Sequence, residues 1–242
     1  MLKIENLSVS VAEAPILKNL NLEIGDGEVC ILLGPNGSGK STLLQTIMGS
    51  GKYRIDGGGI TFDGRDITNL PTNERVGLGI SMSFQQPPSI MGVRLIDLLK
   101  RIDKDEKKIA SLADELNMAN FLHRDLNLGF SGGELKRCEM LQLLLLKPKL
   151  TLLDEPDSGV DVENLGLIGK EIETFLKEEK PRVRERSGLI ITHMGSILDH
   201  VRGDRAFVML EGKIACSGNP QELLRDIKEN GYEGCVKCRT QC

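Results

Sequence analysis

The sequence predicts an α/β protein with a mainly parallel core sheet, an antiparallel β region near the N-terminus and an inserted helical lobe. Three observations support this fold class. Residues 1–11 and 16–24 alternate polar and apolar side chains, which is typical of strands with one covered face. Residues 29–33 are apolar throughout, which indicates a strand buried on both faces. Residues 87–128 show apolar positions at helical spacing and no buried strand, which indicates inserted helices.

Strands and helices alternate in the rest of the chain, which favours parallel strands joined by helices. Residues 56–59, Asp-Gly-Gly-Gly, are expected to form a turn because aspartate and glycine favour turns. The remaining expected elements are a helix from Lys40, strands at 60–62 and 80–84, a helix at 133–146, a strand at 150–153, a helix at 162–178, a strand at 189–192, a hairpin of strands 206–210 and 213–216, and a helix near 220–229.

These elements predict a single domain of 242 residues. Its α/β body is expected to comprise residues 1–86 and 147–230. Residues 87–146 form the expected helical lobe, and residues 231–242 form a tail that contains cysteines.

The composition, 40% hydrophobic and 27% charged, is that of a globular protein with enough apolar residues for a core. The formal net charge of −4 argues against a general nucleic-acid-binding protein, which usually carries a basic excess. Pro181 and Glu185 interrupt the basic stretch 180–186, so a solvated loop is expected there. No apolar run reaches the roughly 18 residues of a membrane-spanning helix, and the first residues lack a secretory signal pattern. We therefore expect a cytoplasmic protein without membrane insertion.

The strongest motif is a glycine-rich loop between the apolar run 29–33 and the next expected helix. It matches the pattern GxxxxGK[ST], in which backbone N–H groups surround a phosphate and the helix N-terminus adds its positive dipole end. Lys40 is expected to contact the β- and γ-phosphates of a nucleotide, and the Ser41 hydroxyl to bind Mg²⁺. An ordinary glycine turn is the alternative, and the flanking strand and helix argue against it. The motif consists of Gly34, Pro35, Asn36, Gly37, Ser38, Gly39, Lys40, Ser41 and Thr42.

Two carboxylates follow a second apolar run, at 150–153. An aspartate at the end of a buried strand can hold Mg²⁺ through water, and a neighbouring glutamate can polarise an attacking water. Asp154 and Glu155 occupy these two positions. A strand that ends in a charged turn is the alternative, but the preceding phosphate-loop motif favours the metal-side and catalytic interpretation.

Ser131, Gly132 and Gly133 stand at the start of the expected helix 133–146. Ser131 and Glu134 have the S-x-x-E spacing of a capping box, which predicts a structural role at the start of the helix. Glycines after a serine at a helix N-terminus also expose N–H groups to an anion. The two roles are compatible, and both remain open from these residues alone.

Taken together, the three motifs resemble those of the ABC ATPase family, and the resemblance covers nearly the whole chain. It identifies residues 34–42 as Walker A, Asp154 and Glu155 as Walker B with its catalytic glutamate, and FSGGE at 130–134 as the ABC signature. The resemblance therefore implies a P-loop NTPase fold and an enzyme that hydrolyses ATP with Mg²⁺. It also assigns Gln85 to the Q-loop on the metal side, Asp157, Ser158 and Asp161 to the D-loop, and His193 to the catalytic switch position.

The resemblance further implies an ATP-dependent homodimer. Walker A of one chain would face Ser131 and Gly133 of the other, with ATP between them. Members of the family usually place an aromatic ring against adenine, whereas this sequence has Val11 at the corresponding position. We therefore expect apolar packing to hold the base, which leaves the preference for ATP over GTP open.

Within the family, the sequence is most similar to the SufC-type ATPases of the Suf iron–sulfur cluster assembly system. It carries FSGGE and DEPDSGVD where transporter subunits more often carry LSGGQ and DEPTSALD. The segment between Gln85 and Ser131 is shorter than in bacterial members, as in a minimal or archaeal-type version. The resemblance implies a soluble SufB/SufD-like scaffold partner. The nucleotide-binding subunit of a membrane ABC transporter is the main alternative; an ABC protein of DNA repair or translation and a structural nucleotide-binding module are weaker ones.

The cysteines divide into two groups. Six cysteines in 242 residues do not make a disulfide framework, and Cys30 and Cys138 lie in apolar or helical contexts typical of reduced packing residues. Cys235, Cys238 and Cys242 have a CxxC-then-C spacing that could ligate zinc or an iron–sulfur cluster. Three thiols are one short of the usual four ligands, so an inert reduced tail, a metal or cluster contact, and redox chemistry all remain open.

Overall fold

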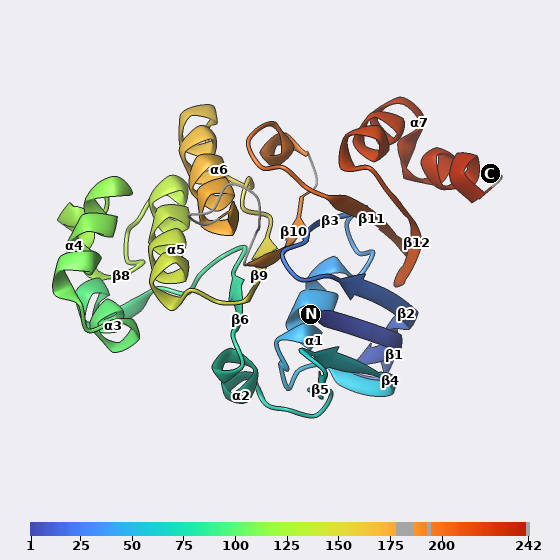
Figure 1. Ribbon diagram of the computed structural model, residues 1–242, viewed down its shortest axis with the longest axis horizontal. Coiled ribbons are helices and arrows are strands. Elements are labelled where there is room, and N and C mark those ends of the chain that lie inside the picture. The colour runs from blue at the N-terminus through green and yellow to red at the C-terminus, as the bar shows by residue number, and fades with distance from the viewer. Residues whose placement is uncertain (178–185, 193–194, 241–242) are drawn as a thin grey trace.

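The computed structural model describes residues 1–177, 186–192 and 195–240, and it confirms the predicted α/β fold class (Figure 1). The described residues form three sheets: a six-stranded sheet of order β12-β11-β3-β10-β9-β6, a four-stranded sheet of order β2-β1-β4-β5, and a two-stranded sheet of β7 and β8. The strands are β1 (Leu2–Val11), β2 (Ala14–Ile24), β3 (Val29–Leu33), β4 (Arg54–Phe62), β5 (Arg65–Asp66), β6 (Ile80–Ser83), β7 (Ile90–Arg94), β8 (Asp125–Leu126), β9 (Leu150–Asp154), β10 (Ser187–Ile191), β11 (Arg205–Leu210) and β12 (Lys213–Gly218).

Helices cover the main sheet and form most of the region at the left of Figure 1. They are α1 (Lys40–Ile47), α2 (Thr72–Gly77), α3 (Leu95–Ile102), α4 (Glu106–Glu115), α5 (Gly132–Leu146), α6 (Val162–Lys177) and α7 (Pro220–Thr240), with short 3₁₀ helices at Ala119–Phe121 and Ser196–Asp199. Within the described residues, no helix is both long and apolar enough to cross a membrane.

The main sheet is parallel except at one edge. β3, β6, β9, β10 and β11 pair in parallel, and β12 pairs antiparallel with β11. The carboxyl ends of parallel strands lie at the same edge of a sheet, where ligands of α/β proteins usually bind. The phosphate loop therefore follows β3 at the edge where Phe84 follows β6 and Glu155 follows β9.

Strand β3 shows why its sequence is apolar without alternation. All five of its residues are buried, but they contribute to two different cores. Val29, Ile31 and Leu33 pack in the core that includes residues of α5 and α6, whereas Cys30 and Leu32 pack in the core that includes α1 and the antiparallel sheet of β1, β2 and β4. A strand covered on both faces needs apolar residues at every position.

Residues 56–59 do not form a turn, so that prediction is wrong. They lie inside β4, which pairs with β1 from Arg54 to Phe62. The pairing register shifts between Glu5 and Ser8, and Gly58 adopts a φ of 78° opposite this irregularity. A Cβ atom at Gly58 would lie 2.3 Å from the Glu5 carbonyl oxygen, so a β-bulge requires glycine here.

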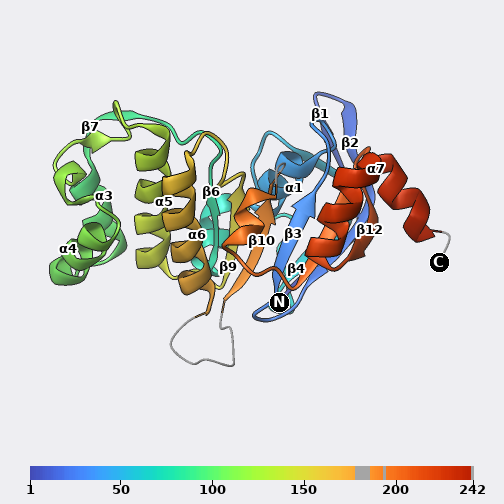
Figure 2. The same cartoon turned by 90° about the horizontal axis from the view of Figure 1, so that it is seen from above.

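The region 87–128 is mainly helical, as expected, but it also contains β7 and β8. These strands pair at Ile90–Leu126 and Arg94–Asp125. All five residues of β7 are exposed, so the strand has no buried apolar face to mark it in the sequence. The small sheet lies beside α3 at the outer end of the molecule (Figure 2).

The C-terminal helix is longer than predicted. We expected a helix near 220–229 and a polar tail from 231, whereas α7 continues to Thr240 across a kink at Gly231. Cys235 is fully buried and belongs to the core of the main sheet, which the polar composition of the tail did not indicate. Beyond the kink, the second half of α7 runs outward to the C-terminal end (Figure 1), and its residues Tyr232 and Val236 line a cavity together with Leu210 and Ile214 of the β11–β12 hairpin.

Candidate functional site

The phosphate loop forms a tight connection from β3 to α1, and two of its glycines explain its course. A Cβ atom at Gly34 would lie 2.4 Å from the Met209 carbonyl oxygen of β11. Gly39, which precedes α1, has a φ of 106°, which an L side chain rarely adopts. A Cβ atom at Gly37 would meet no other atom within 4 Å, so the tip of the loop is uncovered. This is the backbone shape that a phosphate-binding loop needs.

The Lys40 side chain is buried inside this loop, with 5% of its surface exposed. Its Nζ donates to the carbonyl oxygens of Gly34 at 2.8 Å and Pro35 at 2.9 Å. Burial lowers the pKa of Lys40, and the charges of Glu155 and Asp154 act against this shift. The ammonium is therefore oriented by the loop and faces the two carboxylates predicted for the metal side.

The two carboxylates lie where β9 ends. Ser41 Oγ donates to Asp154 Oδ1 at 3.4 Å, and Gln85 Nε2 donates to Glu155 Oε2 at 2.6 Å. Burial raises the pKa of Asp154, while the hydrogen bond from Ser41 acts against the rise. The structure thus brings the predicted residues Ser41, Gln85, Asp154 and Glu155 together, although they come from three separate segments.

A cavity of about 570 Å³ lies between the loop and these side chains. Its size is within the range of ordinary small-molecule sites. Ile16 also lines it and was not predicted, because an isolated isoleucine in an alternating strand has no distinguishing pattern. Val11, the expected neighbour of the base, is not among the lining residues, which are Ile16, Asn36, Gly37, Gly39, Lys40, Ser41, Thr42, Gln85 and Glu155.

The predicted D-loop residues have clear structural contacts. Asp157 Oδ2 accepts hydrogen bonds from Thr192 Oγ1 at 2.7 Å and Ser196 Oγ at 2.9 Å. The Ser158 N–H donates to the Glu155 carbonyl oxygen at 3.0 Å. Asp157 therefore joins the end of β9 to the segments on either side of residues 193–194. His193, the predicted switch residue, lies outside the described residues.

Asp161 has a different contact from Asp157. Its Oδ1 accepts from the Asn164 backbone N–H at 2.9 Å, and its Oδ2 accepts from Asn164 Nδ2 at 2.7 Å. These contacts satisfy an N–H group in the first turn of α6, which is the usual role of a helix cap.

The signature residues lie at the start of α5, and the predicted capping box is present. Ser131 Oγ accepts from the Glu134 backbone N–H, and Glu134 Oε2 accepts from the Ser131 backbone N–H. A Cβ atom at Gly133 would lie 2.8 Å from the Asn164 side chain, so this glycine also permits close packing on α6. Neither Ser131 nor Gly133 lines the 570 Å³ cavity of its own chain.

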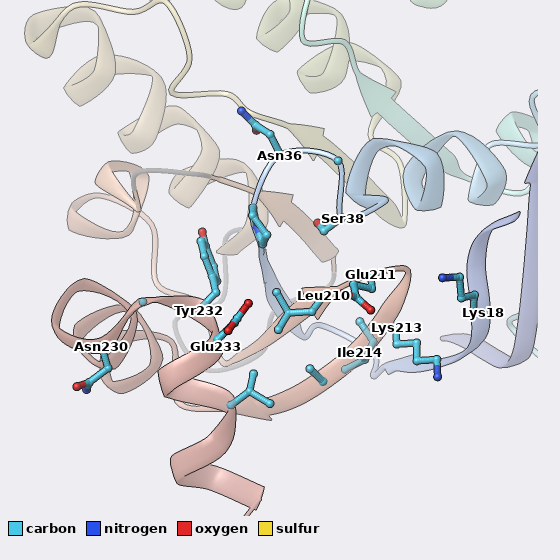
Figure 3. A pocket seen from close by; sticks show the side chains of 15 residues that line it. Lys18, Asn36, Ser38, Leu210, Glu211, Lys213, Ile214, Asn230, Tyr232 and Glu233 are labelled. Carbon is cyan, nitrogen blue, oxygen red and sulfur yellow. The ribbon is translucent and has the colours of Figure 1, made fainter. Parts of the chain in front are cut away.

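The outer side of the phosphate loop is held by residues that sequence reasoning missed. The Gly212 N–H donates to the Ser38 carbonyl oxygen at 3.0 Å, which ties the turn of the β11–β12 hairpin to the loop. Tyr232, on α7 beyond the kink, is hydrogen-bonded to the backbone of Gly34, and its ring points toward the loop (Figure 3). Burial raises the pKa of Tyr232, and the Gly34 hydrogen bond acts against this rise.

A second cavity, of about 880 Å³, lies between this outer side of the loop, the β11–β12 hairpin and α7 (Figure 3). Apolar side chains such as Leu210, Ile214 and Val236 line it together with Lys18 and Lys213. It shares Asn36 and Gly37 with the first cavity, so the tip of the phosphate loop separates the two.

The tail cysteines do not form a recognisable metal site in the part of the chain that the structure describes. Cys235 is buried among apolar residues, and Cys242 lies outside the described residues. No group of three or more histidine, cysteine, aspartate or glutamate residues with metal-binding geometry occurs among the described residues. The prediction of a thiol site at Cys235, Cys238 and Cys242 therefore stays a prediction.

Comparisons with known proteins show the family and the fold of the chain. The family profile described as "ABC transporter" matches residues 17–158. The chain is 38% identical to the "Probable ATP-dependent transporter SufC" of Escherichia coli, with 96% of this chain and 97% of that protein covered. It is 40% identical to a probable ATP-dependent transporter of Synechocystis, with 96% of this chain and 94% of that protein covered. A nucleotide-free ATP-binding cassette from an ABC transporter superposes with a TM-score of 0.77 at 26% identity, covering 95% of both chains.

The fold and the site define a P-loop ATPase. The chain belongs to the ABC transporter family, in which it is a SufC-like ATP-binding subunit that hydrolyses ATP. The predictions of fold, family and ATPase activity are therefore confirmed.

Proposed function

We propose that this protein is the ATP-hydrolysing subunit that drives rearrangement of a soluble scaffold partner in iron–sulfur cluster assembly. The observation that carries the proposal is the link between the site and the surface: Gln85, which contacts Glu155, directly follows Phe84, whose side chain is 46% exposed. The similarity to SufC over nearly the full length of both chains supports the choice of a scaffold partner.

The residues of the site fit ATP and Mg²⁺. The loop offers backbone N–H groups and Lys40 to the phosphates, while the oxygens of Ser41 and Asp154 and the amide of Gln85 are the hard donors that Mg²⁺ prefers. Bound Mg²⁺ would neutralise charge on the phosphates during the reaction. The Ser41–Asp154 contact at 3.4 Å is long for an O–H···O hydrogen bond, which leaves these oxygens available to a cation.

Glu155 is suited to act as the general base. It accepts a proton from the attacking water while the water oxygen bonds to the γ-phosphorus and the bond to the bridging oxygen of ADP breaks. Gln85 orients the carboxylate through its hydrogen bond at 2.6 Å. Glu155 also adopts a φ of 50°, a left-handed conformation that costs about 1–2 kcal/mol for a residue other than glycine and is typical of functional sites.

Glu155→Gln tests this role. The variant should retain ATP binding, lose about 100-fold or more of the hydrolysis rate, and accumulate as an ATP-bound dimer. Steady-state phosphate release and size-exclusion chromatography with ATP measure these outcomes. Glu106→Gln, at an exposed carboxylate of α4, is the matched control. Normal hydrolysis by Glu155→Gln would exclude Glu155 as the base.

The dimer is proposed to place Ser131 and Gly133 of one chain against the phosphate loop of the other. Supporting this arrangement, Ser131 is exposed at the N-terminus of α5, Gly133 lies buried in the first turn behind it, and both are absent from the lining of their own chain's cavity. His193 would complete the closed site. We propose that the protein works in the cytoplasm.

The surface around Phe84 is proposed as the docking site of the scaffold. Most of the exposed large apolar side chains among the described residues gather on or beside the segment 84–93, and Met91 is 79% exposed. Exposed apolar groups that lie close together mark protein interaction sites more often than isolated ones do. Those of this docking surface are Phe84, Ile90, Met91, Val93, Leu128 and Leu146.

Affinity purification of the tagged chain from its native cytosol and from solubilised membranes tests the partner. A soluble SufB/SufD-like protein that carries iron and sulfide is expected, and its capture should be lost in Met91→Asp. Val76→Asp is the matched control. It changes an exposed valine of α2, which precedes the start of β6, whereas Phe84 of the docking surface follows the end of that strand. Recovery of an integral membrane protein instead would support the alternative of a transporter subunit.

A further inference from the structure

Helix α5 carries a buried ion pair that the mechanism above does not use. Lys136 and Glu139 are one turn apart, with 5% and 7% of their surfaces exposed, and Lys136 Nζ lies 3.4 Å from Glu139 Oε2. Charged side chains are rarely buried to this degree, and a buried pair is often no more stabilising than apolar residues of similar size. Its presence therefore needs a reason other than stability.

Both members of the pair bind the backbone of the same residue in the Q-loop. Glu139 Oε1 accepts from the Phe84 N–H at 2.6 Å, and Lys136 Nζ donates to the Phe84 carbonyl oxygen at 2.7 Å. Lys136 Nζ also reaches the Gln85 carbonyl oxygen, at 3.3 Å. Strand β6 ends at Ser83, so the sheet ladder no longer holds these groups. Only a donor and an acceptor together can fix both sides of this peptide segment.

The contacts continue from this backbone into the site. The Gln85 side chain donates to Glu155 Oε2 at 2.6 Å, so the pair on α5 and the proposed general base are joined through one residue. In the other direction, α5 begins at Ser131, whose capping box fixes the start of the helix. The ion pair therefore lies on the helix that begins with the signature motif, and it is connected through Phe84 and Gln85 to Glu155.

We propose that Lys136 and Glu139 are positioning residues that fix Gln85 against Glu155 and transmit a displacement of Phe84, or of α5, to the base. The proposal rests on the proposed function in one respect, the role of Glu155 as base. It assigns no contact with substrate to either residue. The pair acts on turnover because it sets where Gln85 holds the Glu155 carboxylate, whereas the phosphate loop alone sets how tightly ATP binds.

Lys136→Met tests the proposal in the full chain, because it keeps the length of the side chain and removes its donors. We expect kcat to fall about 10- to 100-fold, as is typical of a misplaced catalytic group, with little change in KM for ATP. Lys136→Arg should recover most of the loss, because a guanidinium can still donate to the Phe84 carbonyl oxygen. Glu139→Gln, which can still accept from the Phe84 N–H, should lose less than Lys136→Met.

A double-mutant cycle with Gln85→Ala distinguishes positioning from a purely structural role. If the pair acts through Gln85, Lys136→Met should reduce kcat by less than about twofold in the Gln85→Ala background. An equal loss in both backgrounds, or a rise in KM without a fall in kcat, would overturn the proposal. Hydrogen exchange gives a readout independent of turnover: the Phe84 amide should exchange faster in Glu139→Ala than in Glu139→Gln, and equal rates would also overturn it. Both measurements use the chain without a partner, so a failed search for a scaffold does not affect them.

Discussion

The two sides of the ATP site are built in different ways. The phosphate side consists of nine consecutive residues, 34–42, between one strand and one helix, and Lys40 bonds within that same segment. The side that carries Gln85, Asp154 and Glu155 takes its residues from the ends of separate strands and holds them through side chains such as Lys136. Local geometry suits a loop that must bind ATP in every state. Geometry assembled over long range suits a catalytic side that a partner can move.

The phosphate side is not held by local contacts alone, because α1, the helix that follows the loop, is also bonded to Arg75, a residue distant in sequence. Arg75 is 1% exposed and donates to the carbonyl oxygens of Thr46 and Ile47, at the end of α1, and of Thr68 and Leu70.

The largest expected effect is on stability, from Arg75→Met. The substitution removes the guanidinium donors that Arg75 gives to four buried or half-buried carbonyl groups, and we expect the free energy of unfolding to fall by about 3 kcal/mol or more. Chemical denaturation followed by circular dichroism measures the change. Arg65→Met, at an exposed arginine, is the control and should change stability by less than about 0.5 kcal/mol. A similar loss in the two variants would mean that Arg75 does not anchor α1.

The second prediction compares the two sides directly by their effect on ATP affinity. Lys40→Ala should weaken ATP binding about 10- to 100-fold, since it removes a charged donor that is worth about 1.5–3 kcal/mol. Gln85→Ala, on the other side, should leave affinity within about threefold while hydrolysis falls. Equilibrium binding of a fluorescent ATP analogue measures both. Equal losses of affinity in the two variants would show that both sides of the site contribute to ATP binding, which would contradict this prediction.

The smallest expected effect concerns two buried thiols, one on each side. Burial raises the pKa of Cys30, in β3, and of Cys138, in α5, to about 12. At pH 8 only about one thiol in 10,000 is then ionised, so iodoacetamide should leave both residues unmodified in the native protein. A labelling time course read by mass spectrometry checks this. Faster labelling of Cys138 than of Cys30 would indicate that α5 opens more readily than β3. Labelling of both at the rate of the denatured chain would contradict the burial of these thiols.

The difference between local and long-range contacts also explains which parts of the fold and the site could be predicted from the sequence. The strands predicted at 29–33 and 150–153 were predictable because burial on both faces leaves a nearly continuous apolar run. Residues 34–42 were predictable because a phosphate loop needs glycines and a lysine at fixed spacing. The capping box of Ser131 and Glu134 was predictable for the same reason, since its spacing follows from one turn of helix.

Features that depend on distant contacts were not predictable from the sequence. Nothing in the spacing of Arg75, Lys136 or Glu139 shows that they bind backbone groups far away in the chain. The bulge at Gly58 was mistaken for a turn because both need glycine, and only the partner strand distinguishes them. The roles of His193 and of the tail thiols stay predictions.

The Ser131 hydroxyl can cap its own helix and, at the same time, donate a hydrogen bond to a ligand held by a second chain. A serine hydroxyl has two acceptor lone pairs and one hydrogen. Its cap uses a lone pair, because the hydroxyl oxygen receives the N–H of Glu134. The hydrogen remains available, and a phosphate oxygen held by another copy of the chain is the kind of acceptor it suits. Aspartate at this position would cap the helix equally well but would present negative charge to a triphosphate. Serine combines a cap with a donor, so the start of α5 can remain intact whether or not a second chain arrives.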